Sequence, residues 1–300
     1  MSTNKWTAEN ILDQKGRIAI VTGSSSGIGF ETAKALANKN AKVIIAVRNL
    51  AKGEKAKSKI LSLNKNADVE LMKLDLADLS SVKAFAQEFK NKFQKLDLLI
   101  NNAGVMIPPY SKTKDGFELQ MGTNHLGHFA LTLQLLDIIN ATPNARIVNV
   151  ASAAHKYGNI DFNDLNWEKR KYKSWRAYGD SKIANLYFTK ELAKRINDNN
   201  IKVTAAHPGW TATDLQRHSG LFSFLNNFFA MNQEQGALPT LRAAIDDSAN
   251  SGDYYGPDGW QEWRGYPVKV DMTKLAKDDT IAKKLWQVSE ELTNIKFSLN

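Results

Sequence analysis

The stretch Thr22-Gly23-Ser24-Ser25-Ser26-Gly27-Ile28-Gly29 stands between the apolar run Arg17–Thr22 and a helical pattern over Gly27–Lys39. A strand, a glycine turn and a helix start in this order form a phosphate-binding site. Glycine lets the backbone approach a pyrophosphate, and the helix N-terminus presents unpaired N–H groups. The spacing is T-G-x-x-x-G-x-G rather than the G-x-G-x-x-G of the general dinucleotide fingerprint. It predicts a nucleotide-binding turn after the first strand of an α/β sheet.

The same residues allow two other interpretations. Gly23 to Gly27 also satisfies G-x-S-x-G, the nucleophile elbow of α/β-hydrolases. An elbow serine needs an oxyanion-hole loop from an earlier strand, and here the strand is the first in the chain, which disfavours a hydrolase. A glycine-rich turn without a ligand is the other alternative for this stretch taken alone.

Apolar runs and helical patterns alternate along the first two thirds of the chain. The expected strands are Arg17–Thr22, Lys42–Val47, Val69–Leu74, Leu96–Asn101, Arg146–Ala151 and Ile201–Ala206. The expected helices are Gly27–Lys39, Ala51–Leu63, Leu79–Phe93, Gly116–Asn140 and Arg176–Ile196. Continuous apolar strands are typical of sheets covered on both faces. We predict an α/β protein, a single doubly wound Rossmann-type domain over 1–300, with a mostly parallel sheet flanked by helices on both faces.

Composition narrows the class of protein further. Of the 300 residues, 43% are hydrophobic and 24% charged, which is typical of a globular chain that can bury a full core. The chain contains no cysteine, which excludes disulfides, thiolate catalysis and cysteine-held metal centres within it. The start MSTNKWTAEN resembles no signal peptide, and no apolar run reaches the length of a membrane span. We therefore expect a cytoplasmic protein without a transmembrane segment.

The formal net charge of +9 raises the question of a nucleic-acid partner. Lysines are scattered over the expected helices, and the one dense cluster is EKRKYKSWR at 168–176. No recognition motif accompanies the charge, so we expect no nucleic-acid binding. A basic protein still attracts an anionic cofactor.

The end of the second expected strand indicates which nucleotide is bound. An NAD site places Asp or Glu there to accept hydrogen bonds from the ribose 2′-hydroxyl. This strand ends Ala46-Val47-Arg48-Asn49, and the next acid, Glu54, lies inside a helix. A guanidinium grips a 2′-phosphate in a bidentate way, so Arg48 favours NADP(H), the alternative being an exposed arginine in a turn.

Later strand ends carry residues suited to the same crevice, since ligands of doubly wound sheets bind beyond the carboxyl ends of the strands. Asp75-Leu76 follows the third expected strand, and Asp75 could accept a hydrogen bond from an adenine amino group. Asn101-Asn102-Ala103-Gly104 follows the fourth, where Ala103 and Gly104 are small enough for a cofactor to pass closely.

Candidate reacting groups come next along the chain. Ser152 follows the fifth expected strand, and Tyr178 and Lys182 share one face of a helix at i and i+4. A nearby ammonium lowers the pKa of a phenol, and a tyrosine tuned in this way can exchange a proton with a carbonyl oxygen. A second Y-x-x-x-K match, Tyr110 to Lys114, follows Pro108-Pro109 in an expected loop, and we treat it as chance.

With these residues in view, the sequence resembles the short-chain dehydrogenase/reductase family over roughly residues 15–250. TGSSSGIG, NNAG, the serine after the fifth strand and YGDSK stand in the family's order. The resemblance is closest to the branch of retinol dehydrogenases, WW-domain oxidoreductases and protochlorophyllide reductases. Its marks are AVRN at 46–49, NHLGHFALT at 124–132, the Ser152-to-Tyr178 interval and HPGWTATDLQRHSG at 207–220.

The resemblance implies a role for each matching residue. Tyr178 would be the general acid/base, Ser152 would orient the carbonyl, Lys182 would tune the tyrosine and bind the nicotinamide ribose, and Asn124 would hold a relay water. The residues implied in cofactor binding are Gly23, Ser25, Ser26, Gly27 and Ile28 at the phosphates, Asn101 and Ala103 beside the ribose and adenine, and Pro208, Gly209 and Thr213 at the carboxamide. It also implies a homodimer or homotetramer built from the long helices after the fourth and fifth strands.

Three histidines need separate consideration. His125 and His128 are three residues apart on an expected helix, a spacing that can ligate metal. No H-E-x-x-H motif or cysteine accompanies them, so helix packing is the preferred interpretation and we expect no metal. His155 lies three residues after Ser152, and the sequence leaves its role open.

The substrate side is expected in the last third of the chain. Residues 210–235 form the expected substrate loop, whose Phe-rich part 221–231 could be core, a lid, or an interface. A helix is expected over Glu234–Asp246, and 251–300 form an aromatic C-terminal extension. Within it, GDYYGPDGWQEWRGYP at 252–267 suits a packed loop rather than a regular element.

Together these features predict an NADP(H)-dependent oxidoreductase that interconverts an alcohol and a carbonyl group of a lipophilic small molecule. Reduction of an activated carbon–carbon double bond is the alternative within the fold. Non-catalytic NADP(H) binding or sensing is the alternative from another class. It is disfavoured because a pure binder needs none of the proton chemistry of Tyr178 and Lys182.

Overall fold

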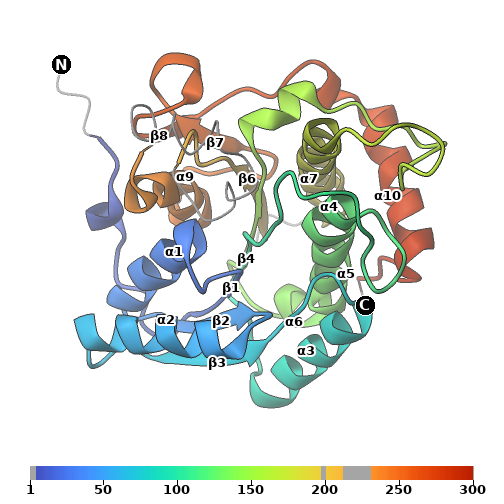
Figure 1. Ribbon diagram of the computed structural model, residues 1–300. Coiled ribbons are helices and arrows are strands. Elements are labelled where there is room, and N and C mark those ends of the chain that lie inside the picture. Colours follow the sequence, from blue (N-terminus) through green and yellow to red (C-terminus); the bar gives the residue numbers. More distant parts are fainter. Residues whose placement is uncertain (1–4, 197–200, 212–230, 300) are drawn as a thin grey trace.

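The computed structural model describes residues 5–196, 201–211 and 231–299. In these residues one sheet crosses the molecule in the order β3-β2-β1-β4-β5-β6-β7-β8 (Figure 1). The strands are β1 (Ile18–Thr22), β2 (Lys42–Val47), β3 (Val69–Lys73), β4 (Leu98–Asn101), β5 (Arg146–Val150), β6 (Lys202–Ala206), β7 (Tyr254–Pro257) and β8 (Pro267–Lys269). Neighbours are parallel from β3 to β7, and β8 runs antiparallel to β7. The predicted doubly wound, mostly parallel sheet is confirmed.

Helices cover both faces of this sheet, as predicted (Figure 1). The longer helices are α1 (Gly27–Asn38), α2 (Leu50–Leu63), α3 (Leu79–Lys92), α5 (Gly127–Gln134), α7 (Ser174–Ile196), α9 (Gln233–Ile245) and α10 (Asp279–Thr293). Short 3₁₀ turns are η1 (Ala8–Asn10), η3 (Ala153–Tyr157), η5 (Trp260–Glu262) and η6 (Leu275–Lys277). Successive residues of β1 point into the hydrophobic cores on opposite faces of the sheet. Ile20 belongs to the same core as Phe85 of α3, and Val21 to the same core as Leu36 of α1. This two-sided burial explains the continuous apolar runs.

The expected long helix over Gly116–Asn140 is interrupted. The chain forms α4 (Leu119–Met121), a π-helical turn η2 (Gly122–Leu126), α5 and the short α6 (Leu136–Asn140). Close approach at α5 accompanies the change, because a Cβ on Gly127 would lie 2.4 Å from the carbonyl oxygen of Leu76. π-turns inside helices frequently mark functional sites, and this one contains Asn124.

The expectation of a loop in the aromatic stretch 252–267 is wrong in part, since β7 forms there and β8 begins at its last residue, Pro267. Tyr254 and Tyr255 are both buried, and they belong to cores on opposite faces of the sheet. Their registry with Ala205 and Ala206 extends the sheet by two strands. The sequence run is too short and too rich in Gly and Pro to show this pattern.

The C-terminal helix α10 packs along α7, where Figure 1 shows it in red at the edge of the molecule. Its Trp286 ring lies 5.1 Å from the ring of Phe129 and 5.9 Å from that of Phe188. Among the described residues, no helix has both the length and the apolar character needed to cross a bilayer.

Candidate active site

The glycine turn after β1 lies where the sequence places it. Gly23 has φ +68°, and a Cβ there would lie 2.8 Å from the Cα of Ala103, so this turn requires glycine. Gly27 opens α1 with φ +62°. Ser26, the N-cap residue, makes no side-chain capping hydrogen bond, so the first N–H groups of α1 are not occupied by it. The turn has the open helix N-terminus that an anionic ligand requires.

A groove of about 390 Å³ runs from this turn across the carboxyl ends of the strands. It brings together most of the predicted cofactor residues. Those lining it are Gly23, Ser25, Ser26, Gly27, Ile28, Arg48, Asp75, Leu76, Ala103, Gly104, Tyr178, Lys182 and Pro208.

One end of the groove is basic. Arg48, exposed beyond β2, and Lys52 both line it. Asn49 between them caps α2, accepting a hydrogen bond from the backbone N–H of Lys52 at 3.0 Å. Asp75 also lines the groove, and its Oδ1 accepts from the N–H of Ala77 at 3.0 Å.

The expectation for Asn101 needs correction. Its side chain is buried and donates to the hydroxyl of Thr132 at 3.0 Å and to Oδ1 of Asn149 at 2.8 Å, away from the groove. The neighbouring Asn102 lines the groove instead, and its side chain donates to the carbonyl of Thr22 at 2.8 Å. Asn101 is the last residue of β4, and its two partners belong to α5 (Thr132) and β5 (Asn149).

Tyr178 and Lys182 project from the start of α7. Tyr178 is only 7% exposed, and burial raises the pKa of its phenol to about 12, while a hydrogen bond with Ser152 acts in the opposite direction. Burial lowers the pKa of Lys182 to about 8. The ammonium donates to the carbonyl of Val150 at 3.1 Å and lies 5.7 Å from the centre of the Tyr178 ring. The expected lowering of the tyrosine pKa by Lys182 is therefore not found: burial raises this pKa, and the group that acts to lower it is Ser152.

Asn124 lies behind the groove rather than in its wall. Its Oδ1 accepts from the N–H of Val105 at 2.8 Å, and its Nδ2 donates to the carbonyl of Val105 at 3.0 Å and to the hydroxyl of Ser181 at 2.9 Å. A Cβ on Gly104 would lie 3.0 Å from the same Oδ1. Asn124 therefore joins the wall at 104–105 to α7.

The histidines pack inside the molecule. His125 is hydrogen bonded to the Ser289 hydroxyl at 2.8 Å, and His128 to the Thr22 hydroxyl at 2.9 Å, which confirms the packing interpretation. His155 is buried, with its Nδ1 2.8 Å from the carbonyl oxygen of Ser152. This histidine therefore supports the segment that carries Ser152.

A second, larger cavity of about 1160 Å³ adjoins the groove. It shares Ile28, Tyr178 and Pro208 with the groove, and Ser152 also lines it. Its other walls are largely apolar and aromatic, with Met106, Tyr157, Trp175, Trp210, Trp260, Trp263 and Leu275. The sequence did not single out these tryptophans as cavity residues. Thr213 and the Phe-rich part 221–231, except Met231, lie outside the described residues.

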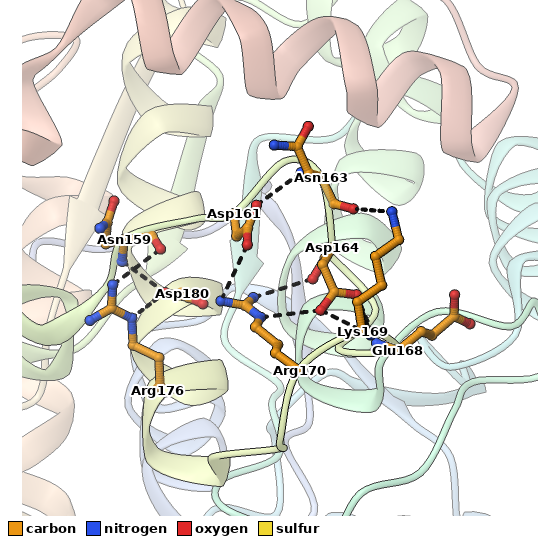
Figure 2. Close-up of polar contacts among 9 residues, drawn as sticks. All are labelled: Asn159, Asp161, Asn163, Asp164, Glu168, Lys169, Arg170, Arg176 and Asp180. Atoms are coloured by element: carbon orange, nitrogen blue, oxygen red, sulfur yellow. Dashed lines mark hydrogen bonds and ion pairs between the residues drawn. The ribbon is translucent and has the colours of Figure 1, made fainter.

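The wall at Gly158 and Asn159 is fastened to α7 (Figure 2). Oδ1 of Asp180 accepts from the N–H of Asn159 at 2.7 Å, and the Arg176 guanidinium lies 3.3 Å from the same oxygen. Burial raises the pKa of Asp180 to about 6. Farther along this loop, Asp164 accepts from two backbone N–H groups and pairs with Arg170 (Figure 2).

The second Y-x-x-x-K match has a different setting. Tyr110 is 42% exposed and donates to the carbonyl of Asn166 at 3.0 Å. Lys114 pairs with Asp78 at 2.8 Å, outside any helix. This geometry agrees with the interpretation of the match as chance.

A glycine turn at a helix N-terminus, together with a buried tyrosine and lysine beside the same groove, defines a nucleotide-dependent oxidoreductase domain. A family model for the short chain dehydrogenases matches residues 17–221, and the chain belongs to this family. Members of the family are oxidoreductases that use a nicotinamide cofactor.

Individual relatives agree with this assignment. Retinol dehydrogenase 12 of Homo sapiens is 43% identical over 287 residues, which cover 94% of this chain and 88% of the relative. A crystal structure of an uncharacterised Mycobacterium paratuberculosis protein superimposes with a TM-score of 0.82 at 40% identity, covering 98% of this chain and all of that one. The Pseudomonas aeruginosa RhlG/NADP active-site complex matches with a TM-score of 0.64 at 25% identity, covering 81% and 94% of the two chains.

Proposed function

We propose that this protein is an NADP(H)-dependent oxidoreductase that interconverts an alcohol and a carbonyl group of a lipophilic small molecule. The observation that carries the proposal is the position of Tyr178, which lines both the nucleotide groove and the aromatic cavity. A group at this junction can reach a substrate on one side and a cofactor on the other. The nicotinamide, when bound, supplies or accepts the hydride.

Tyr178 then serves as the acid/base. Its raised pKa keeps the phenol protonated at neutral pH, so in the reducing direction it donates the proton that the carbonyl oxygen needs. The Ser152 hydroxyl, which is hydrogen bonded with Tyr178 and lines the same cavity, would orient that oxygen. Lys182 brings a positive charge to the groove and would hold the nicotinamide ribose. Asn124 fixes the groove wall at 104–105. The family resemblance gives it the further role of holding a relay water.

The groove fits a phosphorylated dinucleotide. Gly23, Ser25, Ser26, Gly27 and Ile28 surround the open N-terminus of α1, which suits a pyrophosphate. Arg48 and Lys52 at the basic end favour the 2′-phosphate of NADP(H) over an unmodified ribose.

The remaining part of the groove suits the other portions of the cofactor. Asp75 and Leu76 line the groove where they would border the adenine, and the small Ala103 and Gly104 would let the cofactor pass closely. Pro208 and Gly209 would meet the carboxamide, with Thr213 as the third residue that the family pattern supplies.

The aromatic cavity supports a lipophilic substrate. Its tryptophans and Met106 supply apolar surface, which favours a molecule with a large apolar body. The retinol dehydrogenases among the relatives are named for a substrate of this kind.

A panel of apolar aldehydes and ketones tests the proposal when NADPH oxidation is followed by absorbance, with NADH as the control. Tyr178→Phe is expected to lower kcat about 100-fold or more while the dissociation constant for NADPH stays unchanged. Tyr110→Phe, from the chance motif, is the matched control and should retain wild-type kcat. Unchanged turnover in Tyr178→Phe would disprove the acid/base role, and failure of the wild type to bind either nucleotide would disprove the whole proposal.

A further inference from the structure

Glu262, in the C-terminal extension, contacts two segments that line the aromatic cavity together with Tyr178. Its Oε2 is 2.9 Å from Nε2 of His207, and its Oε1 is 3.6 Å from the ammonium of Lys156. His207 directly precedes Pro208, which lines both cavities. Lys156 belongs to η3, the turn that starts immediately after Ser152. One carboxylate therefore connects the two sides of the candidate active site.

The His207 ring is held in one orientation. It is fully buried, and its Nδ1 accepts a hydrogen bond from the N–H of Gly209 at 3.3 Å. Burial lowers the pKa of His207, so the ring is neutral at pH 7 and its proton is on Nε2, facing Glu262. A Cβ on Gly256 would lie 2.1 Å from this Nε2, so the ring fits only beside a glycine.

The same extension grips the backbone of the turn after His207. The N–H of Trp210 donates to the carbonyl of Trp263 at 2.7 Å. Gly209 has φ +67°, and a Cβ there would lie 2.6 Å from that carbonyl oxygen. The path of the chain past the cavity mouth is therefore set by residues 255–263 of the extension.

The backbone around Glu262 adopts an unfavourable conformation. Gln261 and Glu262 have φ of +53° and +58°, in the left-handed region where residues with a Cβ are uncommon. Such conformations persist where surrounding contacts hold them, and they gather at functional sites. Here the two residues turn the chain so that Trp260 and Trp263 line the cavity, whereas Glu262 does not.

The Ser152 side of the site reaches the same support. His155, next to Lys156, is bonded to the carbonyl of Ser152. The rings of His155 and His207 both pack against Tyr254 of β7, at 5.7 and 5.2 Å between ring centres. The segments that carry Ser152 and Pro208 therefore both pack against Tyr254. Glu262 contacts a residue of each segment, Lys156 and His207.

We propose that Glu262 is a positioning residue, which through His207 and Lys156 holds the 207–210 turn and the Ser152 segment in place around the cavity that Tyr178 lines. Glu262 touches neither cavity, so it acts on the reaction only through the residues it holds. The kinetic part of this inference rests on the proposed function, and the structural part does not.

Three substitutions separate the possibilities. Glu262→Gln keeps an oxygen that can accept from Nε2 of His207, whereas Glu262→Ala removes it. Glu262→Asp keeps the charge but withdraws the carboxylate, and aspartate tolerates the left-handed conformation well, so this variant is expected to fold. Asp271→Ala, which breaks an exposed ion pair with Lys277 elsewhere in the extension, is the matched control.

Two readouts are used on folded, nucleotide-binding protein. We expect kcat for carbonyl reduction to fall about tenfold in Glu262→Ala and Glu262→Asp, to recover in part in Glu262→Gln, which keeps the bond to His207 but not the ion pair with Lys156, and to be unchanged in Asp271→Ala. Amide hydrogen exchange of Gly209 and Trp210 should accelerate about tenfold in the same two variants only.

The exchange readout needs no turnover, so it tests the positioning role even if the wild type reduces no carbonyl, an outcome that would count against the proposed function alone. Wild-type kinetics and exchange in Glu262→Asp would overturn the inference. Equal losses in Glu262→Gln and Glu262→Ala would overturn it as well.

Discussion

The ammonium of Lys182 lies 3.1 Å from the carbonyl oxygen of Val150, the last residue of β5. The side-chain amide of Asn185 donates to the same oxygen at 3.1 Å. The first half of α7 is thereby fixed to the sheet directly beside Tyr178. The lysine is fully enclosed, and this burial lowers its pKa to about 8 from the ordinary 10.5.

The low pKa of Lys182 predicts a pH-dependent cost to stability. Between pH 8 and 10.5 the unfolded chain holds a proton that the folded chain has released, so the free energy of unfolding rises with pH in this window. Below pH 8 the full cost is present. Lys182→Met lacks this titration, so its stability relative to the wild type should fall by about 3 kcal/mol from pH 7 to pH 10.

Urea unfolding at pH 7 and pH 10 measures this difference, with the exposed Lys173→Met as the control. Lys182→Met should also lose most of its turnover. If the difference in the free energy of unfolding between Lys182→Met and the wild type stays constant over this range, burial does not lower the pKa of Lys182.

Much of the sheet could be predicted because its signal is local. The runs at β1, β2 and β5 are apolar on both faces, and the glycine turn after β1 has a spacing that needs no tertiary knowledge. The π-turn at 122–126 could not be predicted in this way. It accompanies the approach of Gly127 to Leu76, residues far apart in sequence, and nothing in the helical pattern announces it.

The candidate site also has residues that local sequence patterns predict and residues that only tertiary contacts define. Arg48, Tyr178 and Lys182 stand at strand and helix ends that the pattern defines, and the groove contains all three. The choice between Asn101 and Asn102 depends on the residue at which β4 ends, a boundary that sequence patterns define poorly. The pair His207–Glu262 joins the residue that follows β6 to the extension, so only the folded chain shows it.

Arg48 carries the prediction of cofactor preference. We expect Arg48→Ala to raise KM for NADPH about tenfold or more, because a charge-assisted pair with the 2′-phosphate is lost. KM for NADH should change little, since NADH lacks that phosphate. Steady-state kinetics with both nucleotides measure the two effects, and Lys55→Ala on the exposed side of α2 is the control. Equal losses for NADPH and NADH would remove the argument for NADP(H).

Asp180 predicts a pH dependence of the opposite sign. Its pKa of about 6 exceeds the ordinary 3.8, so between these values the folded chain holds a proton that the unfolded chain has lost. Stability of the wild type from this group therefore falls as pH rises from about 4 to 6. Asp180→Asn lacks the titration, and its stability relative to the wild type should rise by about 3 kcal/mol from pH 4 to pH 7.

Denaturant unfolding at the two pH values checks this, with Asp247→Asn, an exposed carboxylate, as the control. A loss of stability in Asp180→Asn that is the same at both values would show that the pair with Arg176 outweighs burial. The cavity wall at Asn159 should remain in place in the variant, because an asparagine oxygen can still accept from that N–H.

The position of α10 bears on assembly. The family resemblance implies a homo-oligomer through the helices after β4 and β5, yet in this chain α10 already packs along α7. Trp286 is 3% exposed between Phe129 and Phe188, and the Ser289 hydroxyl holds His125 at 2.8 Å.

A partner could reach the surface under α10 only by displacing this helix, at the cost of exposing the buried tryptophan. We therefore expect no dimer built through α7, which light scattering after gel filtration, combined with cross-linking at micromolar concentration, would check. A stable dimer whose cross-links join α7 of two copies would contradict this expectation and show that α10 leaves its place on assembly.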